Sequence, residues 1–332
     1  MKQLLALALT LCALMSYDQL SLGAEKIRVA NGGFGTAINA VLPAAYHQRL
    51  YQKYGLEAEY IALESGTIGM QTLLANEVQI LFTTGALVVT GNLQGADTTI
   101  IAGGINFFPF TLVVRPEIKT AADVRGKKIA VSRFGSASDY AAQVALEKLG
   151  ADPKQNTFLQ VGANQPRLSA LTSGAIDGSV FSEPFATVAV KQHGMRRLLD
   201  LADSGVPFPE NCFVVKRSYL AQKRSVVVNA LKASIEALYL MKRDKNIARE
   251  VLKKYLRIDD DRLIDIGYDY YLAKHGEDIL TLPDRKGLEF VIEDVARTNP
   301  KAKGQTPESL KVLDGSVLDE IKKSGFIEKV KG

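Results

Sequence analysis

The sequence predicts an α/β protein of two lobes, and three patterns in its 332 residues lead to this prediction. Short β-branched runs are followed at once by Gly, Ser or Thr and then by helical spacing, which is typical of a sheet covered by helices. The run at 115–117 interrupts this alternation and indicates a first crossing between lobes, and ADSGVPFPEN at 202–211 indicates a return. We therefore expect one lobe at 25–115 plus 206–332 and a second lobe at 116–205.

The composition indicates a packed globular chain. Hydrophobic residues make up 47% and charged residues 23% of the sequence, which suffices for a buried core at this length. The net charge is +5, but Lys and Arg are interleaved with Asp and Glu, so no basic stripe suited to a phosphate backbone is found. We expect a surface of mixed charge, a monomer, and no nucleic-acid partner.

Residues 1–24 are typical of a secretory signal. Lys2 gives a basic start, and the apolar core at 4–15 is too short to span a bilayer. Cleavage after Gly23 and cleavage after Ala24 both remain open. We expect a soluble mature protein in the periplasm.

The predicted first lobe begins with three strands, at 27–30, 55–63 and 78–82, each leading into a helix through a polar or glycine junction. Ligands gather where the strands of an open α/β sheet end, so these junctions form a candidate site. Each junction residue could also serve only as a turn or a helix cap. The candidate ligand contacts here are Gly33, Gly35, Thr36, Ser65, Gly66, Thr84 and Gly85.

The first of these junctions, VANGGFG, imitates a dinucleotide-binding fingerprint. Gly33 and Gly35 match its first two glycines, but Ile38 stands where close contact between helix and strand needs Gly or Ala. We therefore expect no nucleotide and no other cofactor. A single helical stretch is expected at 36–54.

Further strands are expected at 98–102 and 110–115, on either side of the aromatic run GGINFFPF. Phe108 in this run is a candidate for stacking on a ligand. Packing of the ring in the core is the alternative.

The second lobe contains the most complete strand, loop and helix of the sequence, TAADVRGKKIAVSRFGSASDYAAQVALEKLG. A strand is expected at 127–132, and Ser136 followed by Asp139 is typical of a capping box that starts a helix. The first N–H groups of a helix lack internal partners and attract an anion or a carbonyl oxygen. We place candidate ligand contacts at Phe134, Ser136 and Ser138; the alternative for Ser136 is a simple cap.

Another expected strand, at 176–181, delivers Glu183 to its end, directly before a proline that suits the first turn of a helix. Glu183 is either a ligand contact or a solvated acid that caps this helix, and both interpretations remain open. From Ser218 onward the pattern is mostly helical.

Motifs for catalysis and for metal binding are missing from the sequence. It has three histidines, and it lacks HExxH, CxxC, GxSxG and GxxxxGK[ST]. The residues that these motifs supply to zinc, redox, serine-hydrolase and ATPase sites are therefore missing. Cys212 lies in the apolar run NCFVV, where a small buried side chain is expected rather than a nucleophile. We expect neither an enzyme nor a metal site.

Three segments, TAADVRGKKIAV, RFGSAS and ALTSGAIDGSVFSEP, resemble the middle lobe of the periplasmic solute-binding proteins of nitrate/sulfonate/taurine-type ABC transporters, within the NMT1/THI5-like superfamily. VANGGFG, LLANEVQILFTTG and a helical C-terminal tail follow that family's order, so the resemblance covers most of the chain. It implies a type II periplasmic binding protein fold, whose two lobes are joined by two crossovers and close over a ligand by a hinge motion. It also implies an ABC transporter permease as partner.

The ligand implied by this resemblance is a small anion or zwitterion of the sulfonate, nitrate or carboxylate kind. The serines at the helix start, with Arg133 close before them, favour an anion, whereas Glu183 would repel a bare anion. A ligand with both an acidic and an N–H group would satisfy both. Two alternatives remain open: a binding protein that docks on a membrane sensor, and a pyrimidine-precursor binding protein or enzyme on the same fold.

Overall fold

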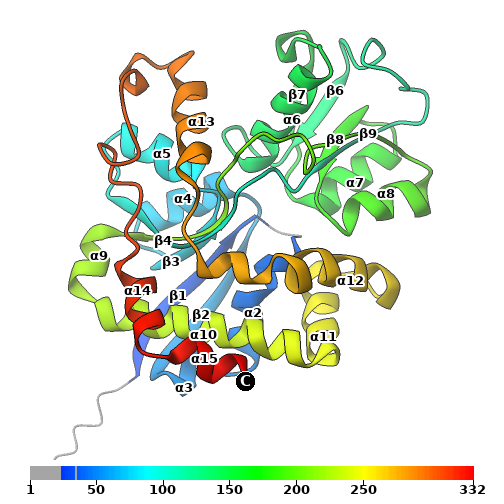
Figure 1. The fold of residues 1–332 in the computed structure, drawn as a ribbon. Helices are drawn as coiled ribbons and strands as arrows, with labels where there is room; N and C mark the ends of the chain where they lie inside the picture. The colour runs from blue at the N-terminus through cyan, green and yellow to red at the C-terminus, as the bar shows by residue number, and fades with distance from the viewer. Residues whose placement is uncertain (1–23, 34–35) are drawn as a thin grey trace, which may run out of the picture.

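The computed structural model describes residues 24–33 and 36–332, so the predicted signal segment lies outside the described residues except for Ala24. The described chain forms two α/β lobes, each built on a five-stranded sheet, which confirms the predicted fold class (Figure 1). The first sheet has the order β2-β1-β3-β10-β4, formed by β1 (Glu25–Gly32), β2 (Leu56–Leu63), β3 (Ile80–Thr83), β4 (Thr98–Ile105) and β10 (Glu210–Lys216). The second has the order β7-β6-β8-β5-β9, formed by β5 (Thr111–Val114), β6 (Lys128–Val131), β7 (Thr157–Gln160), β8 (Gly178–Phe181) and β9 (Arg196–Asp200).

Three strands in each sheet run parallel, and this aligns their carboxyl ends. β1 is parallel to β2 and β3, and β6 is parallel to β7 and β8. Consecutive strands that run in the same direction need a crossover that returns to the starting edge of the sheet, so helices connect them. These helices are α2 (Val41–His47), α3 (Leu50–Lys53), α4 (Gly66–Leu74) and α5 (Ala86–Leu93) in the first lobe, and α6 (Ala137–Lys148), α7 (Asn164–Thr172) and α8 (Phe185–His193) in the second.

The single helix expected at 36–54 is divided into three pieces, η1 (Ala37–Ala40), α2 and α3. Arg49, between α2 and α3, has a φ of 56°, in the left-handed region that ends a helix. The apolar spacing continues across this break, because Leu42 and Leu50 are buried in the same core. Periodicity alone therefore does not reveal the interruption.

The first crossing between the lobes lies earlier than the sequence indicated. The prediction put it at 115–117, but β5 pairs with β8 and β9 in the second sheet, so the chain crosses at 106–110. The second crossing, at 201–209, overlaps the return linker predicted at 202–211. A short, fully buried strand such as β5 carries no signal for which of two sheets it joins, and the second lobe therefore spans 111–200 rather than 116–205.

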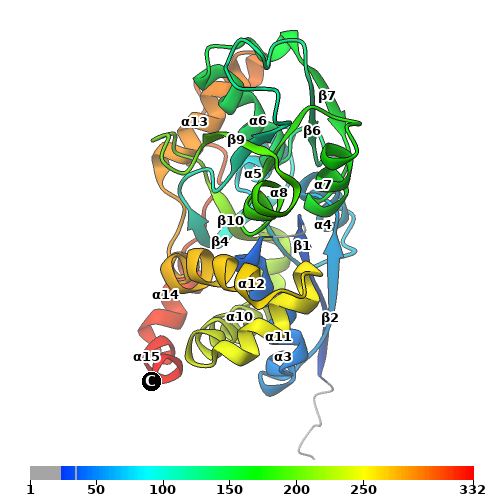
Figure 2. The same ribbon diagram turned by 90° about the vertical axis from the view of Figure 1, so that its right-hand side faces the viewer.

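The C-terminal part covers the first lobe with helices. α10, with twelve buried residues, packs on α2, and Figures 1 and 2 show α10, α11 and α15 below the first sheet and α13 beside α5, reaching toward the second lobe. These helices are α9 (Arg217–Gln222), α10 (Arg224–Arg243), α11 (Lys245–Leu256), α12 (Asp261–Gly267), α13 (Arg285–Ala296), α14 (Ser316–Lys323) and α15 (Phe326–Lys331).

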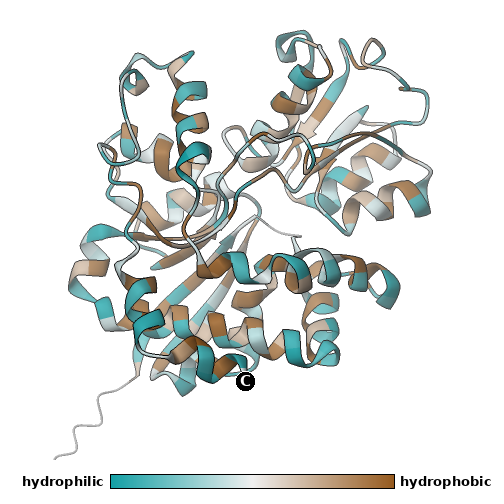
Figure 3. Cartoon of the chain, in the orientation of Figure 1, coloured by the Kyte–Doolittle hydropathy of each residue, from teal (hydrophilic) through white to brown (hydrophobic). Residues whose placement is uncertain are grey.

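Apolar strands occupy the interior of both lobes. β3, β4, β5 and β8 are buried along their whole length, as expected where helices cover both faces of a sheet. Figure 3 shows these hydrophobic strands inside and many hydrophilic residues on the outer helices. Cys212 is buried in β10. Among the helices at 24–33 and 36–332, none combines the length and the apolar character needed to cross a membrane.

Candidate functional site

A cavity lies between the two lobes, at the edge where the parallel strands of both sheets end. The first lobe lines it with residues that follow β1, β2 and β3, among them Gly33, Gly66 and Thr84. The second lobe lines it with residues that follow β6 and β7, among them Ser136 and Asn164. The cavity volume is about 50 Å³, which is room for a compact group of a few heavy atoms. A group held there touches both lobes at once.

Three serine hydroxyls form part of the second-lobe wall. Ser132 Oγ lies 2.9 Å from Ser136 Oγ and 3.0 Å from Ser138 Oγ, and the last two lie 3.0 Å apart. The N–H of Ser132 also donates to Ser138 Oγ at 2.8 Å. All three side chains are buried. Because hydroxyl groups rotate, each can turn its proton toward an acceptor in the cavity.

The capping box predicted at the start of α6 is not formed. Ser136 occupies the N-cap position, but its hydroxyl makes no bond to the helix N–H groups. Asp139 instead accepts a 2.9 Å hydrogen bond from the N–H of Gly135. The hydroxyl of Ser136 is engaged with the neighbouring serines, so the first N–H groups of α6 receive no cap from it.

The positive charge at the cavity comes from Arg167 on α7, whose side chain is 3% exposed. Only neutral acceptors surround the guanidinium, and no coulombic partner among the described residues affects its pKa. Burial lowers the pKa of Arg167 to about 9, so the group stays charged at neutral pH. The acceptors are the carbonyl oxygens of Gly162 at 3.0 Å and of Val180, Ser179 Oγ at 3.0 Å and Asn164 Oδ1 at 2.7 Å.

A buried acid faces the same cavity from the first lobe. Glu210, the first residue of β10, is 8% exposed, and its Oε2 atom has no hydrogen-bond partner among the described residues. Burial raises the pKa of Glu210 to about 8, so the carboxyl group is mostly protonated at neutral pH. The cavity thus combines a cation with an acid that its surroundings keep neutral.

Sequence reasoning missed both Arg167 and Glu210. Arg167 lies in α7, four residues before the buried Leu171, and a lone charge on the inward face of a helix is the signal that points to it. Glu210 falls in the stretch interpreted as a linker. It begins a buried strand there, and no sequence pattern distinguishes it from a solvated acid.

Six of the candidates from the sequence line this cavity, and their contact with a ligand stays a prediction. Thr36 also reaches across the lobes, since its hydroxyl lies 3.3 Å from Ser182 Oγ. Gly35 lies outside the described residues. The six are Gly33, Thr36, Gly66, Thr84, Ser136 and Ser138.

Three other candidates are buried beside the cavity and do not line it. Ser65 is fully buried and accepts a 3.2 Å bond from an N–H of α4, so it caps that helix. Gly85 donates its N–H to the carbonyl oxygen of Pro209 at 2.7 Å. Phe108 is fully buried and stacks on Phe208 with ring centroids 4.0 Å apart, which matches the alternative of core packing.

Phe134 lies outside the cavity, with 51% of the residue exposed. Its carbonyl oxygen accepts a hydrogen bond from the Thr67 hydroxyl at 3.1 Å, and the preceding Arg133 pairs with Glu64 at 3.4 Å. Both contacts join the second lobe to the first. The loop before α6 therefore holds the lobes together through its backbone and Arg133.

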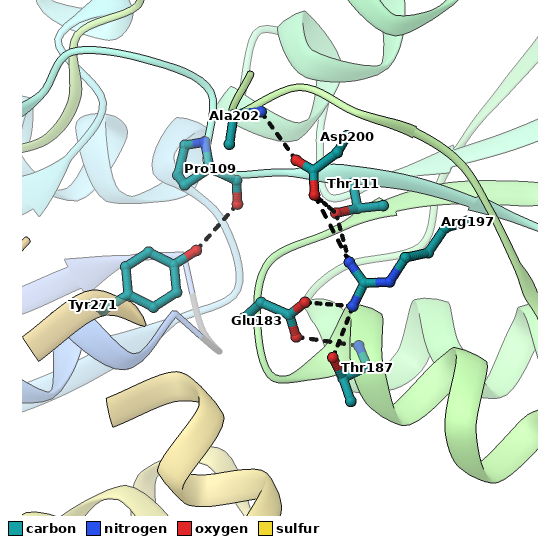
Figure 4. A network of polar contacts seen from close by, with 8 residues as sticks. All are labelled: Pro109, Thr111, Glu183, Thr187, Arg197, Asp200, Ala202 and Tyr271. Atoms are coloured by element: carbon teal, nitrogen blue, oxygen red, sulfur yellow. Dashed lines mark hydrogen bonds and ion pairs between the residues drawn. The ribbon is translucent and has the colours of Figure 1, made fainter. Parts of the chain in front are cut away.

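Glu183 is engaged in a polar cluster outside the cavity (Figure 4). One carboxylate oxygen accepts from the N–H of Thr187 at 3.2 Å, and the other pairs with Arg197 at 2.5 Å. Asp200 lies on the other side of the same guanidinium, at 3.8 Å. Of the two interpretations from the sequence, these contacts match the capping acid, and Arg197 balances its charge.

At 24–33 and 36–332, no group of three or more His, Cys, Asp or Glu side chains is arranged to hold a metal ion.

Two α/β lobes with a polar cavity between their strand ends define the class of two-lobed periplasmic binding protein folds. The model of the family described as NMT1/THI5 like matches residues 40–246, and the chain belongs to this family. The resemblance inferred from the sequence is thereby confirmed. A search of the curated proteins found no match.

Solved structures show the same fold over nearly the whole chain. The periplasmic nitrate-binding protein NrtA from Synechocystis PCC 6803 is 15% identical, with a TM-score of 0.70 over 91% of this chain and 89% of that chain. The periplasmic aliphatic sulphonate binding protein SsuA from Escherichia coli is 18% identical, with a TM-score of 0.65 over 86% and 96%. The desulfurization enzyme DSZB is 13% identical, with a TM-score of 0.64 over 90% and 99%. This fold therefore carries both binding proteins and an enzyme, and the site must decide between them.

Proposed function

We propose that this protein is the solute-binding component of an ABC importer, which captures a small ligand with an oxyanion group between its lobes and delivers it to a membrane permease. The oxyanion is a sulfonate, carboxylate or nitrate. The observation that carries the proposal is Arg167, a buried cation that lines the interlobe cavity with no carboxylate to balance it among the described residues. An anionic ligand supplies the missing negative charge.

Three helix N-termini also favour a negatively charged ligand. The first residues of α4, α6 and α7 are Gly66, Ala137 and Asn164, and all three line the cavity. The N–H groups at a helix start lack internal partners and carry the positive end of the helix dipole. With the serine hydroxyls, they surround the cavity with hydrogen-bond donors.

The chemistry of the lining supports capture rather than catalysis. Its ionisable side chains are Glu64, Arg167 and Glu210, and no His, Cys or Lys is among the described residues that line it. A serine nucleophile needs an adjacent base, and the serines of α6 have none in this lining. NrtA and SsuA are named for nitrate and for aliphatic sulphonate, and we propose ligand chemistry of that kind here.

We further propose that the protein works as a monomer in the periplasm. The signal predicted at 1–24 supports export. Closure of the lobes over the ligand would create the surface that the permease recognises. The proposed ligand contacts are Arg167 and the six sequence candidates that line the cavity.

A thermal-shift screen of sulfonates, carboxylates and nitrate tests this function, followed by calorimetric titration of Ser136→Ala and Ser136→Asp. A bound oxyanion raises the melting temperature by mass action. Alanine removes one hydroxyl donor, which weakens binding up to about tenfold, whereas aspartate adds a like charge at the helix start and weakens it about a hundredfold or more.

Aspartate is a good N-cap, so both variants should fold. Ser316→Asp, at the start of α14 and away from the cavity, is the matched control and should bind like wild type. The proposal is contradicted if no oxyanion stabilises the wild type, or if Ser136→Asp binds as tightly as the wild type.

A further inference from the structure

We propose that the ligand carries, besides its oxyanion, a positively charged N–H group that Glu210 binds. This inference rests on the proposed function, since it assigns the other end of the same ligand. Glu210 and Arg167 line one cavity from opposite lobes, and neither forms an ion pair with any described residue. Arg167 is a cation and Glu210 is an acid, and both line one small cavity. They therefore fit a ligand that has an anionic end and a cationic end.

The protein leaves one oxygen of Glu210 without a donor. A side-chain hydrogen bond with Thr84 lowers the pKa of Glu210, but burial outweighs it. Its Oε2 atom is buried and unpartnered among the described residues. The neighbouring first-lobe donors are already engaged: Thr84, Asn39 and Thr83 each donate to a backbone carbonyl oxygen, at 3.0, 3.0 and 3.5 Å. A buried acceptor without a partner destabilises the protein, so a ligand N–H placed here would remove that cost.

The two walls of the cavity differ in polarity. The second lobe supplies the cation, Arg167, together with the serine hydroxyls and the starts of α6 and α7. The first lobe supplies the start of α4 and both acids of the lining, Glu64 and Glu210. A ligand with its oxyanion toward Arg167 and its cationic group toward Glu210 therefore contacts both lobes with matched charge. The alternative is a protonated Glu210 that donates to the oxyanion, and the experiment below separates the two.

Binding of a cation beside Glu210 changes its protonation. The carboxyl O–H gives its proton to the solvent, and the resulting carboxylate accepts the ligand N–H. The described ionisable groups that act on Glu210 or share its cavity are Cys212 and Tyr271, both neutral because burial raises their pKa values, the charged Arg167, and Glu64. Neither neutral group takes up the proton at neutral pH, so about one proton per ligand is released to the buffer.

Matched probe pairs test this inference: 2-aminoethanesulfonate against ethanesulfonate, and 3-aminopropanoate against propanoate. Calorimetric titration at pH 7 in Bis-Tris and in Tris, neither of which is an oxyanion, measures both affinity and proton release, because the two buffers differ in ionisation enthalpy. In at least one pair, the amino probe should bind wild type at least tenfold more tightly than its partner and release about one proton.

Glu210→Gln should abolish both the preference for the amino probe and the proton release. Glu236→Gln, a carboxylate on α10 that pairs with Lys53 outside the cavity, is the matched control and should keep both. The number of protons that the wild type releases per bound ligand tests the inference even if a variant does not fold.

Two results would overturn the inference, and they are distinguishable. If the amino-free probes bind as tightly as the amino probes without proton release, the oxyanion site stands and Glu210 does not bind a cation. If no oxyanion in either pair or in the wider screen binds, the proposed function fails and this inference fails with it.

Discussion

Arg167 and Glu210 are both buried in surroundings that disfavour their charged forms. Arg167 keeps its charge among neutral acceptors, and a buried charge costs several kcal/mol that such acceptors offset only in part. Glu210 keeps its proton because its surroundings disfavour the carboxylate. The cavity is therefore electrostatically unfavourable by itself, and under the proposed function a bound ligand would offset this cost.

Glu210 should make the ligand-free protein less stable as the pH rises. Its pKa is raised from 4.5 to about 8, so between these values the unfolded chain has lost a proton that the folded protein retains. The free energy of unfolding then falls by up to about 1.4 kcal/mol per pH unit and levels off above pH 8. In Glu210→Gln this loss should be missing.

Urea denaturation of the wild type and Glu210→Gln from pH 5 to pH 8 measures the difference. Other groups titrate alike in the two proteins, so the variant should gain relative stability steadily with pH across this window. A constant difference would mean that Glu210 is ionised in the folded protein without ligand.

At the scale of elements, glycines allow a helix of the first lobe to pack closely against the strand ends beside the cavity. A Cβ atom at Gly69, in α4, would lie 2.7 Å from Leu81 Cδ1 and 3.1 Å from Gly32 Cα. α4 can therefore lie against the end of β1, which sets the position of two of the junctions that line the cavity. Close packing of this kind depends on the missing side chain.

Gly69→Ala should destabilise the protein by about 1 kcal/mol. Overpacking in a core costs about 1–3 kcal/mol, against a gain of up to about 1 kcal/mol from helix propensity. Gly91→Ala in α5 is the matched control, since its Cβ would meet only Ala96 Cβ at 3.4 Å, and it should be neutral or stabilising. Urea denaturation measures both. Equal stability of the two variants would mean that α4 does not need the close approach.

Local elements were predictable from the sequence, and their long-range partners were not. The strands at 27–30 and 78–82 and the helix after Ser136 all exist, because periodicity and junction residues act locally. The sheet that β5 joins and the burial of Glu210 depend on contacts between segments far apart in the chain. Phe108 illustrates the same limit, since an aromatic residue near a cleft has no sequence signal that separates stacking on a ligand from packing in the core.

At the scale of the molecule, two ion pairs hold the lobes together at separate places. Arg133 pairs with Glu64 at 3.4 Å at the rim of the cavity, and Glu147 on α6 pairs with Arg297, just after α13, at 3.4 Å. Both pairs are exposed, so each contributes about 0.2–1 kcal/mol to closure. These two ion pairs therefore add little to the closure of the lobes.

Glu147→Lys should open the ligand-free protein, because it places two like charges between α6 and the end of α13. Small-angle scattering should show a larger radius of gyration at low salt, and the affinity for a bound oxyanion should fall several-fold. The charge swap Glu147→Lys with Arg297→Glu should restore both. An unchanged radius in the single variant would show that this pair does not influence closure.

The two crossings at 106–110 and 201–209 run side by side. They leave the second lobe from paired strands, where Thr111 is opposite Asp200, and reach the first lobe at paired strands, where Ile105 is opposite Glu210. The second lobe thus begins and ends about one strand spacing, roughly 4.8 Å, apart. A segment whose two ends lie side by side can be inserted into another protein chain without changing the path of that chain. Residues 111–200 are such a segment, so relatives could exchange the whole second lobe as one continuous stretch of gene.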